Sequence, residues 1–135
     1  MKLVAESLDI AQSLLPKAKN SRDGKNKFFH FAFGYDNKKL LGIGQNNPDK
    51  THTKALRLHN QFGIKTEYPY FHAETDLISK LWNKYYIDDR LSIVVIRLNK
   101  HGKLRPSKPC KRCSKILSSL GVEKIIWSIN DGFSQ

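Results

Sequence analysis

The stretch LSIVVIRL, at residues 91–98, constrains the fold more than any other part of this sequence. It is an almost continuous apolar run of strand length, whereas a strand with one face in water alternates apolar and polar residues. Such a run is typical of a strand whose two faces are both covered. We therefore expect a buried strand at 91–98, with other elements packed on each side of it.

The residues before this run predict one helix and a β-hairpin. Residues 3–15 place apolar side chains on one helical face, and Pro16 is expected to end this helix. Residues 28–35, FFHFAFGY, alternate in the manner of a strand, with the odd-numbered aromatic residues on one side. Turn residues follow at 36–37, and KKLLGIGQ returns as a second strand.

The residues around and after the run predict two strand–helix–strand units. The apolar stripe of HAETDLISKLWNKYY, at 72–86, predicts a helix whose stripe continues through Trp82 and Tyr85. CKRCSKILSSLG, at 110–121, predicts another helix, and EKIIWSI, at 123–129, predicts a final strand without a visible partner on its outer edge. The expected order is α, β, β, α, β, α, β, with right-handed crossovers onto one mixed sheet.

The length and composition favour one folded domain. A chain of 135 residues with 39% hydrophobic residues is long enough for a single packed core, so we expect one domain over residues 1–135. The connection at 47–71 has weak periodicity, and 53–62 is its only candidate helix. A connection of that length is usually functional or disordered.

Positive charge is the strongest compositional signal. The formal net charge is +12, and the largest basic cluster, at 99–117, contains no carboxylate. Smaller clusters lie at 17–27 and 50–57. Clustered cations gain free energy by releasing the counterions condensed on phosphates, so nucleic acid (DNA or RNA) or a nucleotide is the expected partner. The alternative is a lysine-rich surface that serves only solubility.

The sequence also bears on location. The longest apolar stretches, such as 93–96, are too short to span a bilayer. Glu6 and Asp9 interrupt the N-terminal segment where an export signal needs an apolar core. We therefore expect no membrane contact and a location in a reducing cytoplasm.

The two cysteines, Cys110 and Cys113, occur together in PCKRC at the start of a predicted helix. Their spacing places both sulfurs on one helical face, and the helix N-terminus with Lys111 and Arg112 favours thiolates. A structural zinc ribbon would need a second CxxC pair, which the chain lacks. Two interpretations remain open: a redox pair of the thioredoxin kind, and an open zinc site completed by a histidine and a water.

One histidine stands out as the third ligand. The candidates are His30, His52, His59, His72 and His101. His72 begins a predicted helix, and Glu74 follows it before an apolar stripe. H-x-E is weak alone, but here P-C-x-x-C follows one strand later, and both motifs open a helix. The open ends of such helices meet where parallel strands end, which is a place that can hold a metal and a substrate.

HAE at 72–74 and PCKRC at 109–113 resemble the signature of the cytidine deaminase-like zinc superfamily, H-[AC]-E followed by P-C-x-x-C. GIGQNNP, at 42–48, is similar to the G-x-G-x-N-x-P of bacterial tRNA adenosine deaminases. NPDKTHTKALRLH looks like a segment of small deaminase-like phage proteins, and for a phage-encoded protein the expected cytoplasm is that of the host. The resemblance covers roughly residues 28–130 and implies a three-layer α/β/α sandwich. The family usually adds a fifth strand and a helix, whereas only NDGFSQ follows the final strand expected here.

The resemblance also implies a metal site and a catalytic residue. His72, Cys110 and Cys113 would bind one Zn²⁺ and leave one position for a water molecule. Glu74 would not be a ligand; it would take the proton of that water, pass it to the ring nitrogen, and protonate the departing amine.

Five further residues are expected to contact the substrate. By the resemblance, Asn46 would contact the nucleoside, and the small Ala73, between ligand and base, would let the ring approach closely. Phe71 would stack on an unpaired base, the alternative being that it only packs the entry of the helix. Lys108 and Arg112, in the basic cluster beside the proposed site, would contact phosphates.

The expected function is hydrolytic, zinc-dependent deamination of a nucleobase, with cytosine to uracil favoured over adenine to hypoxanthine. The favoured substrate is single-stranded or flipped-out nucleic acid. One alternative is a free nucleoside or nucleotide such as deoxycytidylate. Another is a non-catalytic, zinc-stabilised module that binds nucleic acid, although a structural site has no need of Glu74. Monomer and homo-oligomer both remain open.

Overall fold

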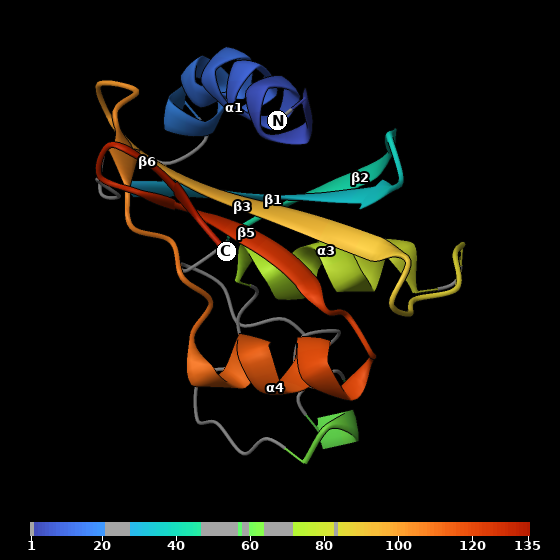
Figure 1. Cartoon of the computed structure of the whole chain (residues 1–135). Coiled ribbons are helices and arrows are strands. Elements are labelled where there is room, and N and C mark those ends of the chain that lie inside the picture. The colour runs from blue at the N-terminus through green and yellow to red at the C-terminus, as the bar shows by residue number, and fades with distance from the viewer. Residues whose placement is uncertain (1, 21–27, 47–56, 58–59, 64–71, 83) are drawn as a thin grey trace.

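The structure is a computed structural model, and it shows the three-layer α/β/α sandwich that the resemblance implies (Figure 1). It describes residues 2–20, 28–46, 57, 60–63, 72–82 and 84–135. Helix α1 (Lys2–Asn20) covers one face of the central sheet. Helices α3 (Ala73–Leu81) and α4 (Lys111–Ser119) lie on the opposite face, the second of them farther from the sheet in this view.

The described part of the chain forms a six-stranded mixed sheet with the order β2-β1-β3-β5-β6, and β4 pairs with β3. The strands are β1 (Phe28–Asp36), β2 (Lys39–Gln45), β3 (Leu91–Asn99), β4 (Leu104–Arg105), β5 (Lys124–Ile129) and β6 (Gly132–Ser134). Strand β1 is antiparallel to both β2 and β3, whereas β3 and β5 are parallel and are joined through α4. The predicted strand–helix–strand unit around the cysteines is therefore confirmed.

The alternation predicted for β1 produces the core on the α1 side of the sheet. Phe31, Phe33 and Tyr35 are fully buried in one cluster with Ala11 and Leu15 of α1. Because aromatic side chains bury large apolar areas, this single strand supplies much of the surface that α1 covers.

The strand at 91–98 is covered on both faces, as its composition predicts. Val94 and Ile96 pack in the cluster beneath α1, while Ile93 and Val95 pack in the cluster that contains α3 and part of α4. All four side chains are fully buried. A strand in this position needs apolar side chains at successive residues, which is why the run does not alternate.

Two predicted helix ends are wrong. Helix α1 does not end at Pro16 but continues to Asn20, because Ala18 in its last turn packs into the core. Helix α3 ends at Leu81, so Trp82 and Tyr85 do not extend its buried stripe and are 38% and 39% exposed.

Two short strands were not predicted. Strand β4 lies in the segment expected to be a basic loop, and it pairs with β3 at Arg97 and Leu98. Strand β6 follows β5 after a tight turn and pairs with it, so the outer edge of β5 has a partner within this chain. Each has few residues, too few for a periodic pattern to be visible in the sequence.

The helix expected at 53–62 falls largely outside the described residues. Among the helices that the structure describes, none combines the length and the apolar character that crossing a membrane requires.

Candidate metal centre

Two helix N-termini carry the three predicted ligands. His72 is the N-cap of α3, and its carbonyl accepts the first helical hydrogen bond from Asp76 N–H at 2.9 Å. Cys110 is the N-cap of α4, whose first turn contains Cys113. The expected starts at residues 72 and 110 are thus confirmed, with each residue as the cap that precedes its helix. Helix N-termini favour anionic groups such as thiolates because their free N–H groups carry partial positive charge.

The side chains of His72, Cys110 and Cys113 converge on one point. The Nδ1 atom of His72 lies 3.5 Å from Cys110 Sγ and 3.3 Å from Cys113 Sγ, and all three atoms lie within 4.8 Å of one another. In a tetrahedral zinc site, bonds of about 2.3 Å to sulfur and about 2.0 Å to nitrogen place these atoms about 3.5 Å apart. The arrangement therefore has the donor types and the spacing of a zinc site with three protein ligands.

The two thiols differ in their surroundings. Cys110 is exposed and Cys113 is buried, and neither forms a disulfide. A hydrogen bond from the Cys113 thiol lowers the pKa of Cys110 to about 3, and the nearby His72 contributes to this shift. The same hydrogen bond, together with burial, raises the pKa of Cys113. The lowered pKa of Cys110 favours its thiolate, which is the form that binds metal.

Glu74 lies beside this cluster but is not part of it. It is in the first turn of α3 and only 4% exposed, and burial raises the pKa of its carboxyl, while hydrogen bonds with its own backbone N–H and with Cys113 oppose this shift. Among the described residues, the atoms that could bind a metal together come from His72, Cys110 and Cys113. A buried carboxyl next to such a group is suited to proton transfer rather than to ligation.

The glycine of β2 nearest to the site lets the start of α3 lie against the sheet. A Cβ atom at Gly44 would lie 2.1 Å from the carbonyl oxygen of Ala73 and 2.5 Å from the backbone nitrogen of Leu77. These distances exclude any side chain there. Gln45 N–H also donates to Asp76 Oδ2 at 2.9 Å, which fixes the end of β2 to the same helical turn. The second glycine of the GIGQNNP motif thus positions the helix that begins with His72.

Asn46 is held by the backbone of β1. Its side-chain Oδ1 accepts a hydrogen bond from His30 N–H at 3.1 Å, and its own N–H donates to the His30 carbonyl at 3.3 Å. The asparagine therefore has a structural role, joining the end of β2 to β1, that sequence reasoning missed. Its contact with a nucleoside stays a prediction.

The other predicted substrate contacts lie at different depths. Ala73 is fully buried in the cluster between α3 and the sheet. Lys108 is exposed, with its Nζ 5.7 Å from the centre of the Trp127 ring, and Arg112 is partly buried in α4. Phe71 lies outside the described residues. No contact of these residues with a substrate has been tested.

Two buried serines hold the segment that leads to Cys110. Ser107 Oγ donates to the Val95 carbonyl at 2.8 Å and lies 2.8 Å from Ser128 Oγ, and Ser107 N–H donates to the Ser128 carbonyl at 2.9 Å. Ser128 Oγ in turn donates to the Arg105 carbonyl at 2.7 Å. We call Ser107 and Ser128 the serine pair. In the sequence there was a signal only for Ser128, a serine within the apolar run IIWSI, whereas Ser107 lies in the basic segment RPSKPC.

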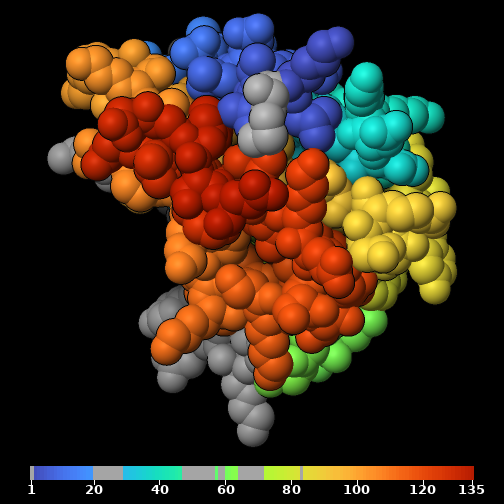
Figure 2. Space-filling model, in the orientation of Figure 1, coloured from blue at the N-terminus to red at the C-terminus, as the bar shows by residue number. Residues whose placement is uncertain are grey.

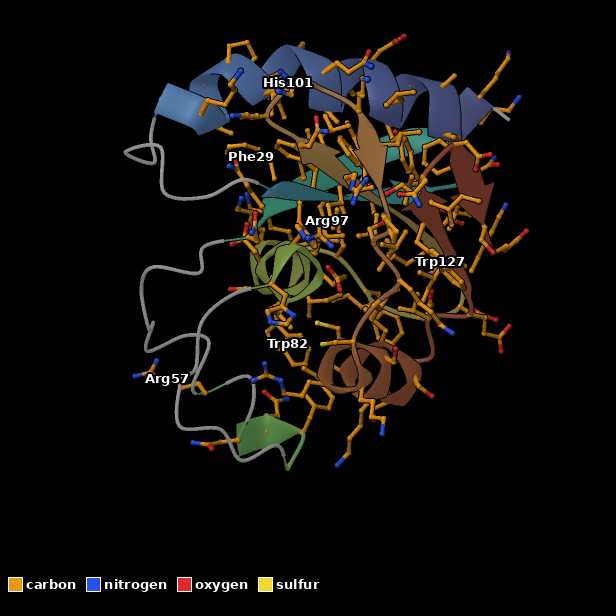
Figure 3. The ribbon with its side chains drawn as sticks, turned by 90° about the vertical axis from the view of Figure 1, so that its left-hand side faces the viewer. Phe29, Arg57, Trp82, Arg97, His101 and Trp127 are labelled. Carbon is orange, nitrogen blue, oxygen red and sulfur yellow. The ribbon has the colours of Figure 1, made fainter. Side chains whose placement is uncertain are left out.

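Figure 3 views the molecule from the side at which α4 begins, which is the side of the metal centre. Arg97 lies between the sheet and the start of α3, and its Nη1 donates to the Pro106 carbonyl at 3.3 Å. Burial, and secondarily Arg105, lowers the pKa of Arg97 below that of an ordinary arginine. Like the serine pair, this contact attaches the strand-like segment before Cys110 to the sheet.

Comparisons with known proteins support the fold. No protein-family model matches the chain, and no curated protein matches it in sequence. Cytidine deaminase from Mycobacterium leprae is similar in structure, with a TM-score of 0.51, 18% identity, and coverage of 91% of this chain and 87% of that one. A mutant cytidine deaminase from Mycobacterium tuberculosis gives a TM-score of 0.51 and 14% identity, covering 92% and 86%.

A third similar structure is the dCMP deaminase of cyanophage S-TIM5 in its apo form. Its TM-score is 0.50 and its identity 20%, with 90% of this chain and 82% of that chain covered. Identities this low show a shared fold. The element order, the mixed sheet and these likenesses together show that the chain has the cytidine deaminase-like fold, with a group at the ends of two helices that could hold a metal ion.

Proposed function

We propose that this protein is a zinc-dependent hydrolytic deaminase that converts cytosine to uracil in preference to adenine to hypoxanthine. The observation that carries this proposal is the convergence of His72 Nδ1 with the sulfurs of Cys110 and Cys113 beside a buried Glu74. Three ligands leave one position of a tetrahedral zinc ion for a water molecule, which distinguishes catalytic from structural zinc sites.

Each residue of the centre has a defined task. Bound zinc supplies a water that ionises near neutral pH. His72, Cys110 and Cys113 would hold the ion at the N-termini of α3 and α4. The Glu74 carboxyl carries protons to the ring nitrogen and to the departing amine, and its burial raises its pKa, which favours the protonated form that such a transfer needs. Ammonia and the keto form of the base are the products.

We further propose that the reacting nucleobase is part of a single-stranded or flipped-out nucleic acid. The segment that leads into the cysteines and the helix that carries them are rich in cations and lack carboxylates from residue 99 to 117. Lys108 and Arg112 lie within a few residues of the ligands, so phosphates next to the reacting nucleotide would meet positive charge. Cations arranged along a surface track a phosphate backbone better than they serve a single phosphate.

A free nucleotide is the second candidate. The likeness to a structure described as a phage dCMP deaminase favours it, and one phosphate would need only one or two of the cations near the cysteines. A non-catalytic zinc module is less well supported, because burying the Glu74 carboxyl has a free-energy cost that a purely structural site has no reason to bear.

The test is turnover of defined substrates by zinc-loaded protein, measured by mass spectrometry. The substrates are single- and double-stranded DNA and RNA that contain cytosine or adenine, together with dCMP, cytidine and adenosine. We expect deamination of cytosine in single strands. Turnover of dCMP alone supports the second candidate, and turnover of no substrate overturns the proposed enzyme.

The variant Glu74→Gln tests the proposed role of Glu74 as the general acid–base. We expect it to keep about one zinc per chain and to lose turnover by about 10²–10⁴-fold, the usual contribution of a general acid–base. The same change at Glu123, which is exposed and precedes β5, is the matched control and should leave turnover unchanged. Parental turnover by Glu74→Gln would show that another group transfers the proton.

A further inference from the structure

The turn between β3 and β4 lies against the C-terminal end of α1, although the two are far apart in the sequence. Lys19 Nζ donates to the Lys100 carbonyl at 2.8 Å, and Leu104 packs against the core cluster that contains Leu15. Figure 1 shows this turn beside α1, and Figure 2 shows their atoms adjoining at the surface. We call Lys19, Lys100, His101 and Lys103 the hairpin patch.

The turn is built to hold its shape. Asn99 Oδ1 accepts hydrogen bonds from His101 N–H at 2.9 Å and from Lys103 N–H at 3.0 Å. Gly102 has a φ of 80°, a conformation that other residues rarely adopt. The side chains of Lys100, His101 and Lys103 are therefore presented to solvent from a fixed backbone, and all three residues are exposed.

The charge around the patch has one sign. Residues 10–20 and 92–122 contain no aspartate or glutamate. The cations in these two segments are Lys17, Lys19, Arg97, Lys100, Lys103, Arg105, Lys108, Lys111, Arg112 and Lys115. A solvated surface with mixed charges would interleave carboxylates, as the opposite end of the sheet does with Asp36, Asp88 and Asp89.

The patch and the metal centre lie on the same side of the molecule. In Figure 3, His101 is at the top beside α1, and Arg97 lies between it and the start of α3. Lys103 and Cys110 are seven positions apart in the sequence, so the distance between their Cα atoms is at most about 25 Å at about 3.6 Å per residue. A nucleic acid strand advances at least about 3.4 Å per nucleotide, the rise of a stacked strand, and therefore covers that length in at most about seven nucleotides.

We propose that the hairpin patch binds the phosphate backbone of a single-stranded nucleic acid within about seven nucleotides of the base held at the metal centre. The choice of a nucleic acid as the partner rests on the proposed function. The hairpin patch itself does not include the proposed zinc ligands, Glu74, Lys108 or Arg112. Fixed cations at a distance from the reacting base lengthen the bound segment. They thereby favour polynucleotides over mononucleotides without contacting the base.

The test uses the double variant Lys100→Ala/Lys103→Ala. Lys19 is kept because its ammonium group holds the turn. The matched control is Lys2→Ala/Lys38→Ala, which removes two exposed lysines at the opposite end of the molecule. Binding of a fluorescent single strand of about 16 nucleotides, a length at the upper end of known site sizes, is measured by anisotropy against salt concentration. Circular dichroism and zinc content check that both variants fold.

We expect the patch variant to bind about 25-fold more weakly at about 0.1 M salt, with a log–log salt slope lower by about 1.4, since each lost phosphate contact on a single strand contributes about 0.7. The control should bind like the parent. Binding of dCMP, which has no second nucleotide to extend toward the patch, should be affected by neither change. Equal losses in both double variants, or no loss in either, overturn the inference.

The binding measurement separates this inference from the proposed function, because anisotropy detects binding whether or not the protein deaminates its substrate. Binding that depends on the patch in a protein that deaminates nothing supports the surface and overturns the enzyme. Deamination of single strands with a patch variant equal to the parent in binding supports the enzyme and overturns the surface.

Discussion

Ser128 positions the segment that leads to Cys110 although it contacts none of the candidate metal ligands. Its hydroxyl is fully buried, accepts Arg97 N–H at 3.1 Å and donates to the Arg105 carbonyl. It also lies 2.8 Å from Ser107 Oγ, three residues before Cys110. A buried hydrogen bond contributes modestly when made, but leaving its partners unpaired is expensive. The serine pair therefore fixes where the chain leaves the sheet on its way to the first cysteine.

Ser128→Ala should lower the free energy of unfolding by about 1–3 kcal/mol, because Arg97 N–H and the Arg105 carbonyl lose a buried partner. Urea denaturation followed by circular dichroism measures the change. Ser118→Ala, at an exposed position in α4, is the control and should change stability by less than about 0.5 kcal/mol. Equal stabilities of Ser128→Ala and the parent would contradict a structural role for the pair.

At the scale of elements, the contact between β2 and α3 sets the position of the first ligand. Gly44 lets the backbone of the strand meet the backbone of the helix, and Lys80 Nζ reaches the Ile43 carbonyl at 3.0 Å while also pairing with Asp76 at 2.9 Å. The start of α3, and with it His72, therefore has little freedom to move away from the sheet.

Gly44→Ala should destabilise the protein by at least about 3 kcal/mol, the upper end of overpacking effects, because the atoms it would meet belong to backbone that cannot turn aside. Gly132→Ala in β6 is the matched control, since a Cβ atom there meets nothing within 4 Å. Thermal and urea denaturation of both variants measure the difference. Similar stabilities of the two variants would show that α3 can shift, and that the contact does not fix His72.

At the scale of the whole molecule, the residues that could hold a metal ion come from two helices in separate parts of the chain. His72 begins α3 and the cysteines begin α4, with β3 and β4 between them in sequence. An ion bound by all three residues would connect the outer helix to the one that packs on the sheet. Metal that binds only the folded chain adds its binding free energy to stability.

Zinc removal by a chelator should therefore lower the melting temperature of the parent. At free zinc about 100-fold above the dissociation constant, the lost stabilisation is about 2.7 kcal/mol. Cys110→Ser, which lacks one ligand, should melt at the temperature of the chelated parent and should not respond to the chelator. A parent that contains zinc yet melts at the same temperature with and without chelator would contradict a link between the helices.

The local patterns of the chain were sufficient to predict most elements and the grouping of His72 with the two cysteines. The strand β1 could be predicted from the alternation of side chains at 28–35, and β3 from the continuous apolar run at 91–98 that burial of both faces requires. The grouping of His72, Cys110 and Cys113 could be predicted because all three residues occur in short motifs at helix starts, and these motifs resemble those of a known superfamily. The residues at which α1 and α3 end could not be predicted, because they depend on packing against residues elsewhere in the chain.

What the sequence determined alone is therefore the periodicity of the strands and helices and the chemistry of HAE and PCKRC. Tertiary structure decided the pairing of β4 and β6, the contact at Gly44, the serine pair, and the meeting of Lys19 with Lys100. Each of these depends on residues that are distant in sequence or on strands too short to show a pattern. The free energy of these pairings and contacts comes from residues that are not neighbours in the sequence.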